Sequence, residues 1–151
     1  MEGGAPAPDL KEWEIKGDTF VLDLNYWEMS KSENIAKTKS KQYAIDVIGV
    51  YQHLTEDKKE FILSKQLLRS GTSIGANIAE SEFGSSEKDF LNKLYIALKE
   101  SNETLYWLEL LYETGYLDKE QFDSLTIPCL ELKRILMAST KTMKDKRMDL
   151  N

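Results

Sequence analysis

The chain has few of the residues from which catalytic and metal sites are built. Its 151 residues include one cysteine, one histidine and three prolines. A single cysteine excludes an internal disulfide, and no paired His-Glu motif of a metalloenzyme occurs. The chain also lacks a run of about 18 apolar residues and a basic-then-apolar leader. We therefore expect a cytoplasmic, non-enzymatic protein with no metal, no cofactor and no membrane partner.

Most of the chain also lacks a large net charge of either sign. The formal net charge is −6, but residues 1–28 hold seven acids and two bases, a net of −5. Residues 29–151 hold 18 bases and 19 acids, a net of −1. This nearly neutral body argues against a broad basic surface for nucleic acid, although it permits a local basic patch.

Two glycines stand inside a segment that otherwise has the pattern of a helix. Gly71, Gly75 and Ala79 recur every four residues and form one stripe of small side chains. A glycine in a helix interior costs about 1 kcal/mol relative to alanine, so the stripe needs a packing reason. The segment lacks the preceding strand and the Gly-Lys-Ser/Thr ending of a phosphate-binding loop. We therefore predict that the stripe allows close approach of another helix.

The same segment carries a polar stripe on a different face, formed by Arg69, Ser73, Asn77 and Glu80. One interpretation is a hydrogen-bond network that fixes helix register or subunit docking. The other is a contact surface for a ligand or nucleic acid. The structural interpretation is favoured.

Other candidate reactive groups give weaker signals. His53 lies near the end of the first predicted helix and has no evident catalytic partner. Cys129 falls on an apolar seam, which is typical of a buried, inert thiol. A di-metal carboxylate site would need Glu-x-x-His pairs, and no histidine follows the candidate glutamates Glu80, Glu82, Glu100, Glu103 and Glu109.

Lysines in the first two predicted helices form the candidate nucleic-acid contact. They are Lys37, Lys39 and Lys41, followed by Lys58, Lys59 and Lys65. A second basic cluster, Lys141, Lys144, Lys146 and Arg147, lies near the C-terminus. Runs of charge are usually a solvated face, so nucleic-acid binding is the less favoured interpretation.

Four helices are predicted from about Asn34 onward, from apolar residues repeating at alternating three- and four-residue spacing. The expected signals at their ends are a Thr55 cap, a capping box over Ser86–Asp89, a stop at Gly115 and a second box over Asp118–Gln121. Pro128 either kinks the last helix or marks its first regular turns. Short connections favour an all-α, antiparallel up-down-up-down four-helix bundle.

The first 28 residues differ in kind from residues 29–151, which form the predicted bundle domain. Residues 3–8 resemble a linker. Alternating apolar residues over 20–26, together with residues 13–15 and a turn at 17–18, predict a β-hairpin. We interpret residues 1–28 as an appended or engineered fusion segment, with a native extension as the alternative. A lone hairpin is marginal in water, so this segment is expected to engage another protein surface.

The motif over residues 66–80 resembles the central signature of the bacterial four-helix-bundle proteins encoded in ribosomal-RNA intervening sequences. The segments 88–90, 94–100, 103–104 and 106–108 resemble this family too, and the resemblance covers about residues 35–143. The family is similar to the accessory variability proteins of diversity-generating retroelements. The resemblance implies a homopentameric ring. In the retroelement branch it also implies binding of nucleic acid and reverse transcriptase through a basic surface.

Together the residues and the resemblance predict a self-associating four-helix bundle that serves as an oligomeric scaffold or interaction module. The alternative is a nucleic-acid-binding accessory protein that works with ribosomal RNA or a reverse transcriptase. The near-neutral charge of residues 29–151 counts against the alternative.

Overall fold

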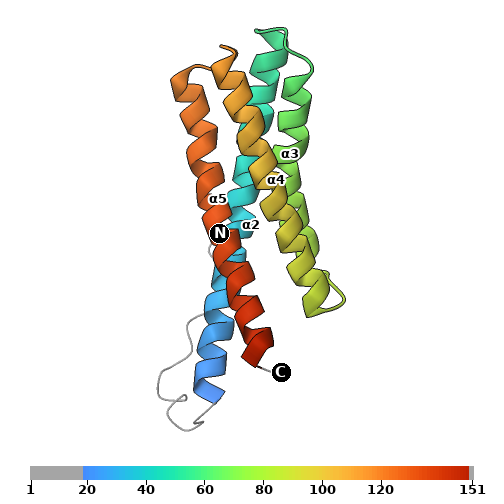
Figure 1. Ribbon diagram of the computed structural model, residues 1–151, viewed down its shortest axis with the longest axis vertical. Helices are drawn as coiled ribbons and strands as arrows, with labels where there is room; N and C mark the ends of the chain where they lie inside the picture. Colours follow the sequence, from blue (N-terminus) through green and yellow to red (C-terminus); the bar gives the residue numbers. More distant parts are fainter. Residues whose placement is uncertain (1–18, 150–151) are drawn as a thin grey trace.

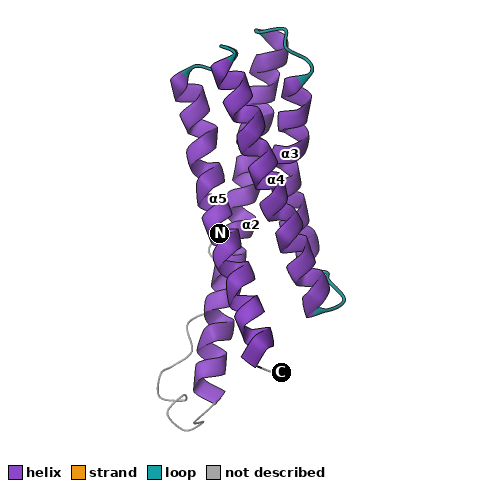
Figure 2. Ribbon diagram, viewed as in Figure 1, coloured by secondary structure: helices purple, strands orange, loops and turns teal. Residues whose placement is uncertain are grey.

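All of the regular structure described for this chain is helical. The computed structural model describes residues 19–149, and in that range it contains four helices and no strand (Figure 2). The helices are α2 (Thr19–Glu56), α3 (Leu63–Ser81), α4 (Glu87–Glu113) and α5 (Lys119–Asp149). The predicted all-α class is confirmed over these residues.

The helices lie side by side, and successive helices run in opposite directions (Figure 1). Each helix packs against its neighbours in sequence, and α2 also packs against α5. α2 has 38 residues and α5 has 31, whereas α3 has only 19. The start of α2 and the end of α5 therefore extend past the turn between α3 and α4 (Figure 1). No described helix contains a stretch long and apolar enough to cross a membrane.

One side of each helix faces a common core. The largest fully buried side chains are Tyr43, Leu54, Leu67, Ile74, Leu108, Leu111, Leu125, Leu132 and Leu136. In α4, Leu94 and Leu108 are buried, whereas Leu98 and Leu105 are half-buried and pack against the core. The smaller Ala97 and Thr104 on this helix are fully buried.

The predicted ends of α4 and α5 match the structure closely. Ser86 Oγ accepts a hydrogen bond from the Asp89 backbone N–H at 3.1 Å. Asp118 and Gln121 form a reciprocal capping box, with backbone-to-side-chain distances of 2.7 and 2.9 Å. Gly115 ends α4 with φ of +82°, a conformation that glycine adopts without steric cost.

The start of α3 differs from the prediction that Thr55 caps this helix. The Thr55 hydroxyl instead donates to the Tyr51 carbonyl at 3.0 Å, inside the last turns of α2. The cap is supplied by the buried Glu60, whose carboxylate accepts backbone N–H groups of Leu63 at 2.8 Å and Ser64 at 2.7 Å. Thr55 fails as a cap because α2 continues through it to Glu56.

The predicted strand over residues 20–26 is wrong, because these residues belong to α2. Their strict alternation fits a strand only where a partner strand pairs with it. No glycine or proline interrupts the chain from Thr19 to Ile48, so the helix propagates through the segment. α2 also crosses the proposed boundary between residues 28 and 29 without a break. The predicted linker at 3–8 and first hairpin strand at 13–15 lie outside the described residues.

Pro128 lies inside α5, nine residues after the helix begins at Lys119. This position excludes the interpretation that it marks the first turn. Proline has no backbone N–H, so the Ser124 carbonyl loses its partner within the helix. Ser124 is exposed, which allows water to satisfy that carbonyl.

Replacing Glu60 tests the unexpected cap. Burial raises the pKa of the Glu60 carboxyl, but hydrogen bonds from the backbone N–H groups of Leu63, Ser64 and Ile62 outweigh it and lower the pKa overall. We expect Glu60→Gln to reduce the free energy of unfolding by about 1–2 kcal/mol at pH 7, measured by urea denaturation at fixed protein concentration.

The pH dependence has a defined sign. A pKa lower in the folded than in the unfolded state stabilises the fold above the unfolded value, and this contribution is lost as the pH falls through the folded value. The difference between wild type and Glu60→Gln should therefore shrink on acidification through the ordinary glutamate range. The exposed Glu56→Gln serves as the control, and equal effects of the two variants would contradict the cap.

Candidate functional site

The small-residue stripe of α3 lies directly against α2 of the same chain. A Cβ placed on Gly71 would lie 2.9 Å from both γ-carbons of Val47, which is fully buried. A Cβ on Gly75 would lie 3.2 Å from the backbone carbonyl oxygen of Ser40. The glycines therefore permit a close approach of α2 and α3 that a larger side chain would prevent.

An uncovered groove follows the outer side of this α2–α3 contact. Its volume is about 220 Å³. Most of the side chains that line it are small, and two are lysines: Lys37, Ser40, Lys41, Ala44, Thr72, Gly75, Ala76 and Ala79. We refer to this feature as the α2–α3 groove. The predicted small stripe thus has two neighbours, since Gly71 and Gly75 meet α2 whereas Gly75 and Ala79 also line the groove.

The polar stripe of α3 faces the opposite seam, toward α4. Arg69 forms ion pairs with Glu103 and, at 3.5 Å, with Glu100. The hydrogen bond from Arg69 lowers the pKa of Glu103, and Trp107 Nε1 donates to the same carboxylate at 3.2 Å. Glu80 accepts a hydrogen bond from Lys93 at 2.7 Å.

The four residues of the predicted stripe do not form one network. Ser73 Oγ donates to the Arg69 carbonyl at 2.6 Å, and Asn77 Nδ2 donates to the Ser73 carbonyl at 2.8 Å. Both side chains are thus used within α3, and only Arg69 and Glu80 bond across to α4. Ion pairs this exposed contribute at most about 1 kcal/mol each, so the seam positions α4 more than it stabilises the fold.

Sequence reasoning missed the partners of Arg69. Glu100, Glu103 and Trp107 recur at spacings of three and four residues, which places them on one face of α4. The sequence spacing places these residues on a common face of α4, but it does not indicate that this face packs against α3.

The candidate lysines of α2 do not form one basic strip. Lys37 pairs with Glu82 beside α3 at 2.8 Å, whereas Lys39 pairs with Glu131 of α5 at 2.6 Å. These two lysines therefore reach to opposite sides of α2. Lys41 is exposed at the α2–α3 groove. The remaining three, Lys58, Lys59 and Lys65, are exposed around the α2–α3 connection.

The histidine and the cysteine are placed apart from each other. His53 Nδ1 lies 2.7 Å from the Asp57 carboxylate, in the last turn of α2. Cys129 is fully buried beside Tyr43, and burial raises the pKa of its thiol to about 11. Its sulfur donates to the Ser101 carbonyl at 3.5 Å. A thiol with this pKa is a poor nucleophile at neutral pH.

Among the described side chains, which cover residues 30–149, no three histidine, cysteine or acidic groups converge in a way that would hold a metal ion. The described surface carries several hollows, among them the α2–α3 groove, and an ion-paired seam between α3 and α4. The groove is open to another surface, whereas the charges of the seam are paired within the chain.

Comparison with known proteins identifies relatives of this arrangement. Residues 32–138 match the family described as 23S rRNA-intervening sequence protein, which is more than half of the chain. The chain belongs to this family. The same family was expected from the motif at residues 66–80, whereas its predicted kinship with retroelement accessory proteins stays a prediction.

A solved structure from Bacteroides thetaiotaomicron VPI-5482 is similar throughout its length. It is described as a protein with unknown function from the S23 ribosomal protein family. Its sequence is 49% identical to this chain, with a TM-score of 0.72. The match covers 73% of this chain and 98% of the other. No curated protein matches this chain.

A substitution at Gly71 tests the close contact of α2 and α3. We expect Gly71→Ala to lower the free energy of unfolding by about 1–3 kcal/mol. The steric cost of the new methyl group against Val47 should exceed the gain in helix propensity of alanine over glycine. Thermal or urea unfolding measures the change. Gly49→Ala is the matched control, because a Cβ at Gly49 has nothing within 4 Å and should stabilise α2.

A second variant distinguishes the Val47 contact from a general effect at Gly71. Val47→Ala removes both γ-carbons that the new Cβ would meet. The double variant should therefore lose less stability than the two single variants added together. Strict additivity would show that the Gly71 cost arises elsewhere.

Proposed function

We propose that this chain is a non-enzymatic, self-associating helical scaffold or interaction module. The observation that carries the proposal is the uncovered α2–α3 groove, which has a volume of about 220 Å³ and is lined mostly by small side chains. A groove of small side chains lets a further helix approach closely, as the glycines do inside the bundle.

Exposed apolar side chains on several helices support the same function. Ile45 and Ile48 of α2 are 53% and 42% exposed, and Ile127 of α5 is 64% exposed. Single exposed apolar residues are ordinary, but several on neighbouring turns indicate contact surfaces. The family resemblance adds a specific expectation, which is a ring of five copies. The bundle topology predicted from the short connections suits such a ring, because it leaves every helix with an outer face.

The mass of the protein in solution tests self-association. We expect light scattering or sedimentation to show an assembly at micromolar concentration, with the mass of five 17.4-kDa chains if the ring is a pentamer. A monomer at about 100 µM would contradict the proposal, since such weak association would not sustain a scaffold.

A nucleic-acid-binding role is the second candidate. It is the role that the family resemblance implies for the retroelement branch. The described structure favours it at one place, the exposed Lys58, Lys59 and Lys65 around the α2–α3 connection. None of the three has an ion-pair partner among residues 19–149. Pairing of Lys37 and Lys39 with carboxylates weakens the candidate elsewhere.

A salt titration decides the nucleic-acid candidate. If it is correct, binding to RNA or DNA should weaken steeply with salt, and replacing all three lysines by glutamine should flatten that dependence. The matched control replaces the ion-paired Lys37, Lys39 and Lys93 by glutamine. No measurable affinity at about 50 mM salt would exclude this role.

A further inference from the structure

The α2–α3 groove has a size and charge that restrict what can fill it. Along α2 it runs from Lys37 to Ala44, and along α3 from Thr72 to Ala79. Each run covers eight residues, or about 10 Å of helix. Ala76 is exposed at the rim, while Lys41 is an exposed cation with no ion-pair partner among residues 19–149. A matching partner carries large side chains and negative charge over the same length.

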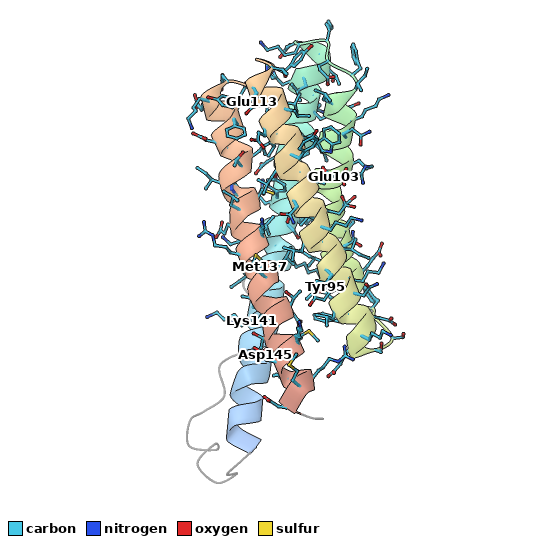
Figure 3. The ribbon with its side chains drawn as sticks, viewed as in Figure 1. Tyr95, Glu103, Glu113, Met137, Lys141 and Asp145 are labelled. Atoms are coloured by element: carbon cyan, nitrogen blue, oxygen red, sulfur yellow. The ribbon has the colours of Figure 1, made fainter. Side chains whose placement is uncertain are left out.

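The outer face of α4 carries those properties. Tyr106 is 54% exposed, and Glu109 and Glu113 are exposed three and seven residues further along the same helix face. Neither carboxylate has an ion-pair partner within the described chain. Figure 3 places Glu113 near the end of α4, away from the α3–α4 turn. We refer to these three residues as the α4 ridge, which also spans eight residues.

An exposed apolar ridge on α5 fits the groove less well than the α4 ridge does. It consists of Ile127, Leu130 and Met137, which are 64%, 38% and 51% exposed. Arg134 and Lys141 are exposed on the same stretch of helix, and Figure 3 shows Met137 and Lys141 on neighbouring turns. Docked on the groove, this ridge would bring cations close to Lys37 and Lys41. Like charges facing each other across an interface disfavour association.

We infer that the α2–α3 groove of one copy receives the α4 ridge of a second copy, with Tyr106 over the small residues and Glu109 facing Lys41. This inference rests on the proposed self-association and names the surfaces that perform it. The groove and the ridge are different surfaces, so the contact is heterologous. Repetition of a heterologous contact builds a ring when the rotation closes.

Reciprocal charge reversal tests the pairing, using the full chain and sedimentation equilibrium. Lys41→Glu and Glu109→Lys should each weaken association by about threefold to tenfold, because each places like charges face to face. The double variant should restore association toward the wild-type value. Lys58→Glu, a reversal on an exposed lysine outside the groove, is the matched control and should change little.

Steric filling of the groove gives an independent test. Ala76→Trp should weaken association by at least about tenfold, because the indole occupies the space that Tyr106 would fill. Ala76 is exposed in the single copy, so helicity by circular dichroism should stay unchanged. Tyr106→Ala, which removes the aromatic side chain of the α4 ridge, should weaken association as well.

The outcomes separate this inference from the proposed function. A monomeric wild-type protein overturns both. A wild-type assembly that is insensitive to Ala76→Trp and to both charge reversals overturns the surface assignment and leaves self-association standing. Sensitivity to Arg134→Glu in place of Lys41→Glu would transfer the interface to the α5 ridge and likewise overturn the assignment.

Discussion

The close approach of α2 and α3 is the constraint on which the rest of this structure depends. It is possible because Gly71 and Gly75 present no side chain to Val47 and to the Ser40 backbone. The same approach leaves the outer side of the seam shallow and lined by small residues. The close packing of α2 against α3 thereby also shapes the α2–α3 groove on the surface.

The seams on the two sides of α3 use different physics. Toward α2 the contact is steric, because a Cβ on Gly71 would lie only 2.9 Å from the γ-carbons of Val47. Toward α4 the outer contacts are electrostatic, through Arg69 and Glu80, while a hydroxyl pair, Ser70 and Thr104, meets at 3.0 Å in the buried layer. Exposed ion pairs tolerate change, whereas a close-packed glycine does not. Substitutions at the close-packed glycines of α3 should therefore be more damaging than substitutions at its exposed ion pairs.

The parts of the fold that were predictable are those governed by local chemistry. The caps at Ser86 and Asp118 and the stop at Gly115 each depend on residues within one turn, so the sequence states them directly. The start of α3 was missed because a buried glutamate replaced the usual hydroxyl cap. The strand over residues 20–26 was wrongly predicted because alternation alone cannot reveal the absence of a partner strand.

The same distinction between local chemistry and tertiary contacts applies to the candidate site. By itself the sequence determined four amphipathic helices, a stripe of small residues and a separate polar stripe, because periodicity and side-chain size are local properties. Only the tertiary structure decided that Gly71 meets Val47, that Arg69 meets Glu103, and that Lys37 and Lys39 are ion-paired on opposite sides of α2. Those contacts join residues more than 20 positions apart, and their choice depends on how whole helices rotate to bury their apolar sides.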